Sequence, residues 1–259
     1  MRQIVVIALL LTATAAVAGD HHSECRYEEP RTLKASLAGV TRIVVHGVAG
    51  TLHVDGRAGV GEFVASGTAC TSDKDLLRDI TLTAHRSGST LHVEADTPDH
   101  NGFSFNFWEE ARLDFGVVVP NNVPIEVQDG SGSTKVTNTA TVKIEDGSGS
   151  LTIENIHGDL IVNDGSGSIE IDGVTGNVEV EDGSGDMTIA NVSGNVEIED
   201  NSGSIDVSHS KHNVLITDDG SGGIDVTDVG GDFTVRSKGS GGIHYARVAG
   251  KVSVPRDDD

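Results

Sequence analysis

Apolar and polar residues alternate in short runs along the second half of the chain. The run from Val178 to Asp182 reads Val-Glu-Val-Glu-Asp, and the run from Met187 to Ile189 reads Met-Thr-Ile. A period of two is that of a β-strand with one buried face. A Gly-Ser-Gly triplet between the two runs supplies residues that favour a reversal of the chain. The pattern predicts two short strands joined by a tight turn.

This two-strand unit recurs. Its turn, Asp-Gly-Ser-Gly, begins at Asp129, Asp146, Asp164, Asp182 and Asp219, and in altered form at Asp200 and Lys238. The successive spacings are 17, 18, 18, 18, 19 and 19 residues. One such unit cannot cover its own apolar face, so neighbouring units have to stack.

Apolar residues also keep the same place in each unit. One inward column reads Ile125, Val142, Leu160, Val178, Val196, Val214, Phe233 and Val252. A meander of β-hairpins is the alternative, but it requires neither constant spacing nor columns in register. The sequence therefore predicts an all-β fold: a single-chain β-solenoid with two short strands per 17–19-residue coil.

The first half of the chain is less regular. It is interpreted as a β-rich N-terminal cap over residues 19–118, followed by the solenoid repeat domain over residues 119–259. The strands expected in the cap are Gly61–Ser66, Ile80–His85, Thr90–Ala95 and Ala111–Val119. Residues 99–110 interrupt the pattern and are expected to form a loop.

The first residues are typical of a secretory signal peptide. Arg2 precedes an apolar run from Ile4 to Leu11, and small residues end at Ala18. This predicts a signal peptide over residues 1–18 and a mature protein that is periplasmic or secreted. Cleavage there exposes Gly19-Asp20-His21, an arrangement that could bind Cu²⁺ through the amine, backbone nitrogens and His21. A metal-free polar tail is the alternative.

The chain contains two cysteines, Cys25 and Cys70. In an exported protein the simplest expectation is that they form a disulfide. Neither belongs to a Cys-x-x-Cys motif, so a redox or metal role is the lesser alternative.

Composition narrows the classes of function. The formal net charge is -22, which argues against nucleic acid and anionic membranes as partners. Aromatic residues are only 3% of the chain, whereas compact globular enzymes usually place more aromatic mass in the core.

With the repeat established, the chain resembles a known bacterial family. A signal peptide, a β-rich lead-in and tandem Asp-Gly-Ser-Gly-Ser turns are similar to the β-strand-repeat domains named "putative adhesins", a domain of unknown function. The resemblance covers roughly Cys25 to Val254. It implies the repetitive fold, and it supplies no catalytic residues.

The repeated aspartates are the first candidate site. Stacking would bring Asp146, Asp164, Asp182 and Asp200 close together, and a divalent cation such as Ca²⁺ could relieve their repulsion. The alternative is that each carboxylate accepts a backbone N–H within its own turn. Calcium-binding repeats of toxins require an Asp where this chain has Ile169, so that chemistry is not expected.

Two further groups are candidates for binding. The first group consists of outward-facing acidic residues, Glu179, Glu181, Glu197 and Glu199. They are expected either to bind a cation or basic ligand or simply to be solvated. The second group is an aromatic cluster formed by Phe103, Phe105, Phe107 and Trp108. It is expected either to contact a partner or carbohydrate or to cover the end of the rod.

The sequence contains no nucleophile elbow, zinc-type His pair or phosphate loop. The interpretation is therefore a non-catalytic exported scaffold or adhesin-like binding module of the cell envelope, with an unknown protein or carbohydrate as partner. A binding protein that depends on divalent cations is the alternative. A β-helix enzyme acting on polysaccharide, with Glu179 and Glu197 as paired carboxylates, is the third.

Overall fold

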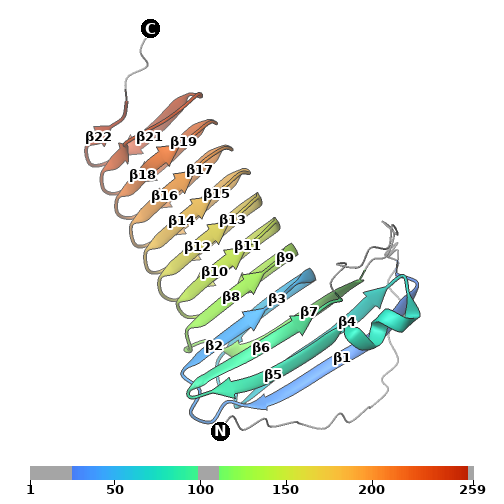
Figure 1. Ribbon diagram of the computed structural model, residues 1–259. Helices are drawn as coiled ribbons and strands as arrows, with labels where there is room; N and C mark the ends of the chain where they lie inside the picture. The colour runs from blue at the N-terminus through green and yellow to red at the C-terminus, as the bar shows by residue number, and fades with distance from the viewer. Residues whose placement is uncertain (1–24, 99–110, 256–259) are drawn as a thin grey trace.

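The computed structural model describes residues 25–98 and 111–255. Strands account for most of these residues, and the helix among them is the short 3-10 helix η1 (Lys74–Asp79). The strands form two sheets of 11 strands each, which face each other along the whole rod (Figure 1). The predicted all-β class is confirmed.

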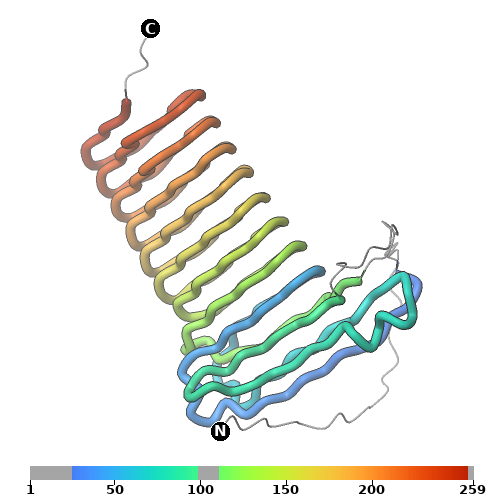
Figure 2. The backbone as a smooth tube through the Cα atoms, viewed as in Figure 1, coloured from blue at the N-terminus to red at the C-terminus, as the bar shows by residue number. Residues whose placement is uncertain are grey.

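The repeat forms the predicted solenoid. Seven coils follow one another, and each contributes one strand to each sheet (Figure 2). Their strands are β8 (Ile125–Asp129), β9 (Ser131–Thr137), β10 (Val142–Asp146), β11 (Gly149–Ile156), β12 (Leu160–Asp164), β13 (Gly167–Val174), β14 (Val178–Asp182), β15 (Met187–Val192), β16 (Val196–Asp200), β17 (Ile205–Ser210), β18 (Val214–Asp219), β19 (Ile224–Val229), β20 (Phe233–Val235) and β21 (Ile243–Val248). The strand β22 (Val252–Ser253) follows them.

Successive coils pair in parallel and almost without register shift. Val178 of β14 lies opposite Val196 of β16, one coil later. The N–H of Val178 donates to the carbonyl of Asn195, and the N–H of Gly183 donates to the carbonyl of Asp164 on the other side, both at 2.9 Å. Each coil is thus bonded to the coil before and the coil after, as the constant spacing requires.

The apolar columns form the core. The predicted inward residues of the middle coils, such as Val180 and Ile189, are 1% and 0% exposed. Ser210 stands where five other coils have Ile or Val, and it is also buried; its hydroxyl donates to the carbonyl of His212 at 3.5 Å. Tyr245 is an exception: it continues an inward column but remains exposed, because the described chain has no coil above it.

A row of Asp and Asn side chains at one corner of the rod also joins the coils, in addition to the backbone pairing. The Oδ1 atom of Asn177 accepts the backbone N–H of Asn195 at 3.0 Å, and Asn195 accepts the N–H of Asn213 at 3.2 Å. The series starts at Asp159 and ends at Lys251, whose N–H donates to Asp232. Backbone donors at this corner are therefore satisfied from coil to coil.

The N-terminal region continues both sheets. Its strands are β1 (Tyr27–Ser36), β2 (Arg42–His46), β3 (Ala49–Arg57), β4 (Glu62–Thr71), β5 (Thr81–Ser87), β6 (Thr90–Asp96) and β7 (Ala111–Pro120). Strands β2 and β3 pair in parallel with β8 and β9, so they form one more coil. Strands β6 and β7 stack beneath that coil, although they follow it in the sequence.

Antiparallel strands close this end. Strand β5 pairs with β6, while β4 pairs with β7 and β1 pairs with β4. The predicted disulfide is present: Cys25 and Cys70 are bonded, with their Cα atoms 5.5 Å apart, and join the start of β1 to the end of β4. The predicted limit between cap and solenoid, at residue 118, falls near the end of β7.

The four strands expected in this region correspond to β4, β5, β6 and β7. Strand β1 was missed. It contains Pro30 and is exposed at most positions, so it lacks the alternation that a half-buried strand shows. The expected loop over residues 99–110 lies outside the described residues.

The last glycine of each repeated turn, whether Gly-Ser-Gly or the variant Asn-Ser-Gly, is fixed by the stacking. These glycines have φ between +127° and +152° and are Gly132, Gly149, Gly167, Gly185, Gly203, Gly222 and Gly241. A Cβ atom on Gly185 would overlap the carbonyl oxygen of Gly167 one coil earlier. Both the dihedral angle and the approach of the next coil therefore exclude a side chain.

We predict that Gly185→Ala lowers the free energy of unfolding by about 3 kcal/mol or more, because strain and backbone overlap act together. Chemical denaturation followed by circular dichroism measures this. Ser184→Ala, one residue away, is the matched control and should change stability by less than about 0.5 kcal/mol. Equal effects of the two variants would contradict the role assigned to Gly185.

Candidate functional site

The repeated aspartates form a continuous line through the solenoid, here named the aspartate ladder. Each is the last residue of its strand, and β18, which ends at Asp219, pairs with β16 after a small register shift. Adjacent members lie directly opposite each other in the parallel sheet. The ladder consists of Asp129, Asp146, Asp164, Asp182, Asp200 and Asp219.

The ladder faces the interior. Its side chains are between 1% and 8% exposed. The cause lies in the strand: Val178 and Val180 point inward, so Asp182 at the next even step also points inward. This signal was present in the sequence, which had predicted the stacking of the aspartates but not their burial.

Some ladder carboxylates accept hydrogen bonds from their own turns. Asp182 accepts the backbone N–H of Ser184 at 3.2 Å, and Asp200 accepts that of Ser202 at 3.1 Å. Asp129 accepts the N–H of Gly130 at 3.0 Å and the hydroxyl of Thr134 at 2.7 Å. The expectation that these aspartates bond within their turns is met at these three positions.

Other carboxylate oxygens of the ladder find no hydrogen-bond partner among the residues that the structure describes. Both oxygens of Asp146 and both of Asp164 are buried without a partner, as is one oxygen each of Asp182, Asp200 and Asp219. Nearby N–H groups of Gly147 and Ser148 offset part of the resulting cost at Asp146. A buried, incompletely bonded carboxylate strongly disfavours its charged form.

The pKa values of the ladder reflect this environment. Burial, as the largest cause, and neighbouring carboxylates together raise the pKa of Asp146, Asp182 and Asp200 to about 6. Burial likewise raises the pKa of Asp129, Asp164 and Asp219. Part of the ladder is therefore protonated in mildly acidic solution.

Cationic groups lie near both ends of the ladder. Lys238 of the last coil lowers the pKa of Asp219, and His46 has the same effect on Asp129. Gly47 lies under Asp129, where a Cβ would come within 2.5 Å of its Oδ1 atom. The two cationic groups thus offset part of the rise in pKa that burial causes at the two ends of the ladder.

The predicted outward acids do lie together on the outer face of the second sheet. Glu179 is directly opposite Glu197, and Glu181 is directly opposite Glu199; all four are exposed. We call these four residues the acidic face.

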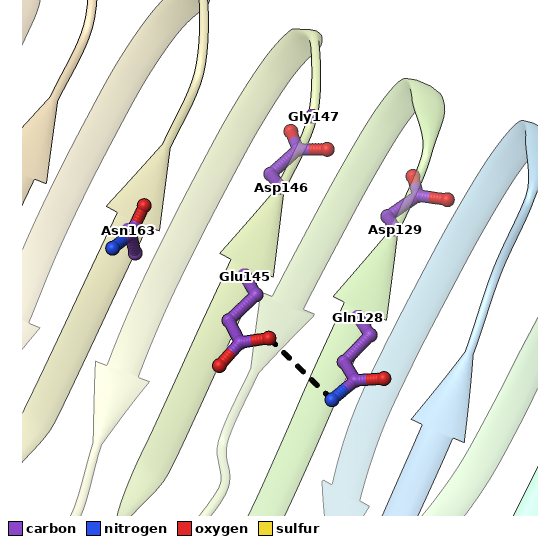
Figure 3. A pocket seen from close by; sticks show the side chains of 6 residues that line it. All are labelled: Gln128, Asp129, Glu145, Asp146, Gly147 and Asn163. Atoms are coloured by element: carbon purple, nitrogen blue, oxygen red, sulfur yellow. Dashed lines mark hydrogen bonds between the residues drawn. The ribbon is translucent and has the colours of Figure 1, made fainter.

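A shallow hollow of about 390 Å³ lies further along this sheet (Figure 3). There the Nε2 atom of Gln128 donates to Glu145 at 3.5 Å, on the outer side, while Asp129 and Asp146 lie toward the turn. Its lining consists of Gln128, Asp129, Glu145, Asp146, Gly147 and Asn163. All of these residues are polar or glycine. The hollow could therefore hydrogen-bond a small polar ligand, but it provides no apolar surface to anchor one.

The geometry does not assemble a metal centre in the described part of the chain. No group of three or more His, Cys, Asp or Glu side chains is placed there to hold a metal ion. The ladder residues stand one per coil rather than converging. Several predicted site residues lie outside the described residues, namely His21, Phe103, Phe105, Phe107 and Trp108.

The carboxylates proposed for glycoside cleavage occupy an open surface. Glu179 and Glu197 are exposed neighbours on adjacent strands, and the hollow beside Glu145 does not include them. A glycosidase places its two carboxylates on either side of the scissile bond, which direct neighbours on one flat sheet do not do. The arrangement is suited to contacts with a surface rather than to enclosing a substrate.

Comparison with known proteins supports this description of the fold. The family model described as Toastrack DUF4097 matches residues 65–254, which is more than half of the chain. The chain belongs to this family. No curated protein matches the Toastrack chain.

Solved structures resemble it at low identity. A "putative adhesin" from Bacteroides fragilis is 14% identical, with 88% of this chain and 97% of that chain covered and a TM-score of 0.44. A "putative lipid binding protein" from Parabacteroides distasonis is 15% identical, with 89% and 98% covered and a TM-score of 0.41. Likenesses of this degree carry no statement about what the Toastrack chain binds.

Within the described residues of this Toastrack chain, no helix has the length and apolar character needed to cross a membrane.

We predict that the ladder makes this Toastrack chain less stable as pH rises from about 4 to about 6. In this range the folded chain keeps protons that the unfolded chain, with Asp pKa 3.8, releases, so the free energy of unfolding falls with rising pH. Well below pH 3.8 the ladder is neutral in both states, and well above pH 6 the full cost is present. Thermal melts across this range measure the trend.

The variant Asp182→Asn tests whether the pH dependence of stability comes from the buried ladder or from the exposed acidic residues. The amide keeps an acceptor for the N–H of Ser184 and removes the buried charge, so melting at pH 7.5 should rise, by about 2–4 °C for each kcal/mol gained. At pH 3, below the pKa of Asp182 in both states, the gain should vanish. Glu181→Gln, in the same strand but exposed, should shift both melts far less, because water and salt screen its contacts with Asn163 and Glu199. A lower melting temperature of Asp182→Asn at pH 7.5 would show that the fold needs the charged carboxylate.

Proposed function

We propose that this chain is a non-catalytic binding module of the bacterial cell envelope, in which the solenoid holds the acidic face in a fixed array. The observation that carries the proposal is the register of the coils, which places Glu179 over Glu197 and Glu181 over Glu199. Each side chain starts from a strand bonded on both edges, so the spacing of the carboxylates is set by the backbone.

The array suits a cationic partner. Neighbouring strands lie about 4.8 Å apart, and alternate residues of one strand lie about 6.6 Å apart. Four carboxylates at these intervals repel one another, and a partner with several Lys or Arg side chains relieves this repulsion at several points at once. Because the acids are exposed, the attraction depends on salt concentration.

Placement outside the cytoplasm is part of the proposal. The signal-like segment over residues 1–18 supports export, and the disulfide between Cys25 and Cys70 is of the kind that persists in oxidising compartments. The partner we propose is a protein or carbohydrate of the envelope or cell surface that carries cationic groups.

A short lysine oligomer is the probe for this proposal. We expect it to bind the purified protein at low salt and to lose at least about tenfold in affinity when Glu179, Glu181, Glu197 and Glu199 are all changed to Gln. Isothermal titration calorimetry measures the loss.

The control carries the same change of charge on the opposite sheet: Glu170→Gln, Asp172→Asn, Asp206→Asn and Asp225→Asn. There Thr188 separates Glu170 from Asp206, so the acids are less dense. This variant should retain most of the affinity. Equal losses in both variants would mean that only overall charge matters, and the acidic face would lose its assigned role.

The alternative function, binding that depends on divalent cations held by the ladder, is tested by the melting temperature with and without calcium. A cation bound only by the folded chain would raise the melting temperature by several degrees in millimolar calcium relative to chelator. We expect no such shift, because the ladder carboxylates stand one per coil and the described residues assemble no group able to hold a metal ion. A clear rise that disappears in Asp164→Asn would establish the cation-dependent function instead.

A further inference from the structure

The charge of the rod changes sign at its last coil. Residues 144–235 contain twenty acidic residues and one lysine. Residues 236–255 contain no acidic residue and four cationic ones, Arg236, Lys238, Arg247 and Lys251. Arg236 and Lys251 are exposed, while Arg247 forms an ion pair with Asp228 of the preceding coil, with N–O distances of 2.5 and 2.8 Å. Within the described residues the end of the rod is therefore basic, in contrast to its sides; Arg256 and Asp257–Asp259 follow in the sequence, outside the described residues.

The same end leaves apolar columns incompletely covered. Val226 is fully buried, whereas Tyr245, its counterpart one coil later, is 49% exposed. The Tyr245 ring packs on buried Phe233, with 6.0 Å between the ring centroids, and its other side is open. Other residues that are only partly buried at this end are Ile243, Val248, Val252 and Val254.

The backbone at this end also has an unpaired edge. Strands β21 and β22 are the last strands of their sheets, at the red end of the tube in Figure 2. Within the rod, the N–H of Ile205 donates to Gly223 and the N–H of Ile224 donates to Gly242 of the next coil. At Ile243 this series stops, because no described strand follows β21 in its sheet. Such an edge is a template for one more strand.

We propose that the end formed by β21 and β22 is a docking surface for an extended acidic peptide segment of a partner protein, which adds to the solenoid as a further strand. Backbone pairing with β21 would continue the sheet. Apolar side chains at every second position would cover Tyr245 and Ile243. Acidic side chains toward the two ends of the peptide would lie near Arg236, which follows β20 and precedes the turn into β21, and Lys251, which follows the turn out of β21. This surface is separate from the acidic face and does not depend on the function proposed for it.

Charge decides between this occupant and a second copy of the chain. Two copies that met through their β21 edges would bring Arg236 and Lys251 of each toward those of the other, and like charges at an interface oppose association. The edges at the other end of the rod belong to β1 and β5, and β1 carries Pro30, which cannot donate to a ladder. An acidic strand from a partner satisfies both the charge and the edge.

A labelled peptide of alternating Val and Glu, about eight residues long, is the probe, with the same peptide carrying Lys for Glu as its control. Fluorescence anisotropy with the purified full chain should show saturable binding of the acidic peptide and none of the basic one. The double variant Arg236→Glu/Lys251→Glu should weaken binding at least about tenfold. The matched variant Lys74→Glu/Arg78→Glu, with the same charge change in η1 at the other end of the rod, should bind as the wild type does.

Two results would overturn the proposal. If no saturable binding occurs, or if both double variants bind equally well, the cations at this end serve only to protect the edge from aggregation. If the protein instead forms dimers through this end, the occupant is a second copy. Unchanged melting temperatures of the variants confirm that binding, rather than folding, is being compared.

Discussion

Parallel pairing of successive coils in register is the constraint on which the rest of this structure depends. Each strand bonds to the equivalent strand one coil away, so residues of the same type are brought directly over one another. For apolar residues this is favourable, because Val178 stacks on Val196 and the columns form a continuous core. The same constraint admits no side chain at Gly185, since the coil beneath occupies the space that a Cβ would need.

Stacking like on like is unfavourable for charged residues, and the chain accommodates this differently inside and outside. On the acidic face, Glu179 and Glu197 are solvated, so water and salt screen their repulsion. In the ladder the carboxylates are buried, and the cost appears as pKa values raised toward neutrality. Turn hydrogen bonds to Asp182 and Asp200 offset only part of it. The ladder therefore secures the turns at the expense of stability at neutral pH.

Much of this fold could be predicted from the sequence because the repeat reports directly on the structure. Constant spacing determines the coils, and alternation determines which face of each strand is buried. The spatial order of the N-terminal strands could not be predicted: β6 and β7 lie beneath β2 and β3, and alternation in a strand does not say which strand is its neighbour. For the site, stacking of the aspartates was predictable. Their partial lack of partners depends on turn geometry at Asp146 and Asp164, where the sequence is the same as at Asp182.

The two ends of the rod show how a repetitive fold acquires direction. A uniform stack would present equivalent edges at both ends and invite unlimited growth. Here the first end is closed by antiparallel strands, with Pro30 in β1 and the disulfide from Cys25 to Cys70 securing the outermost pair. The other end keeps the parallel geometry but changes charge, through Arg236 and Lys251. Because the repeat itself is symmetric along its axis, any selectivity for a partner at an end has to come from such departures from the repeat.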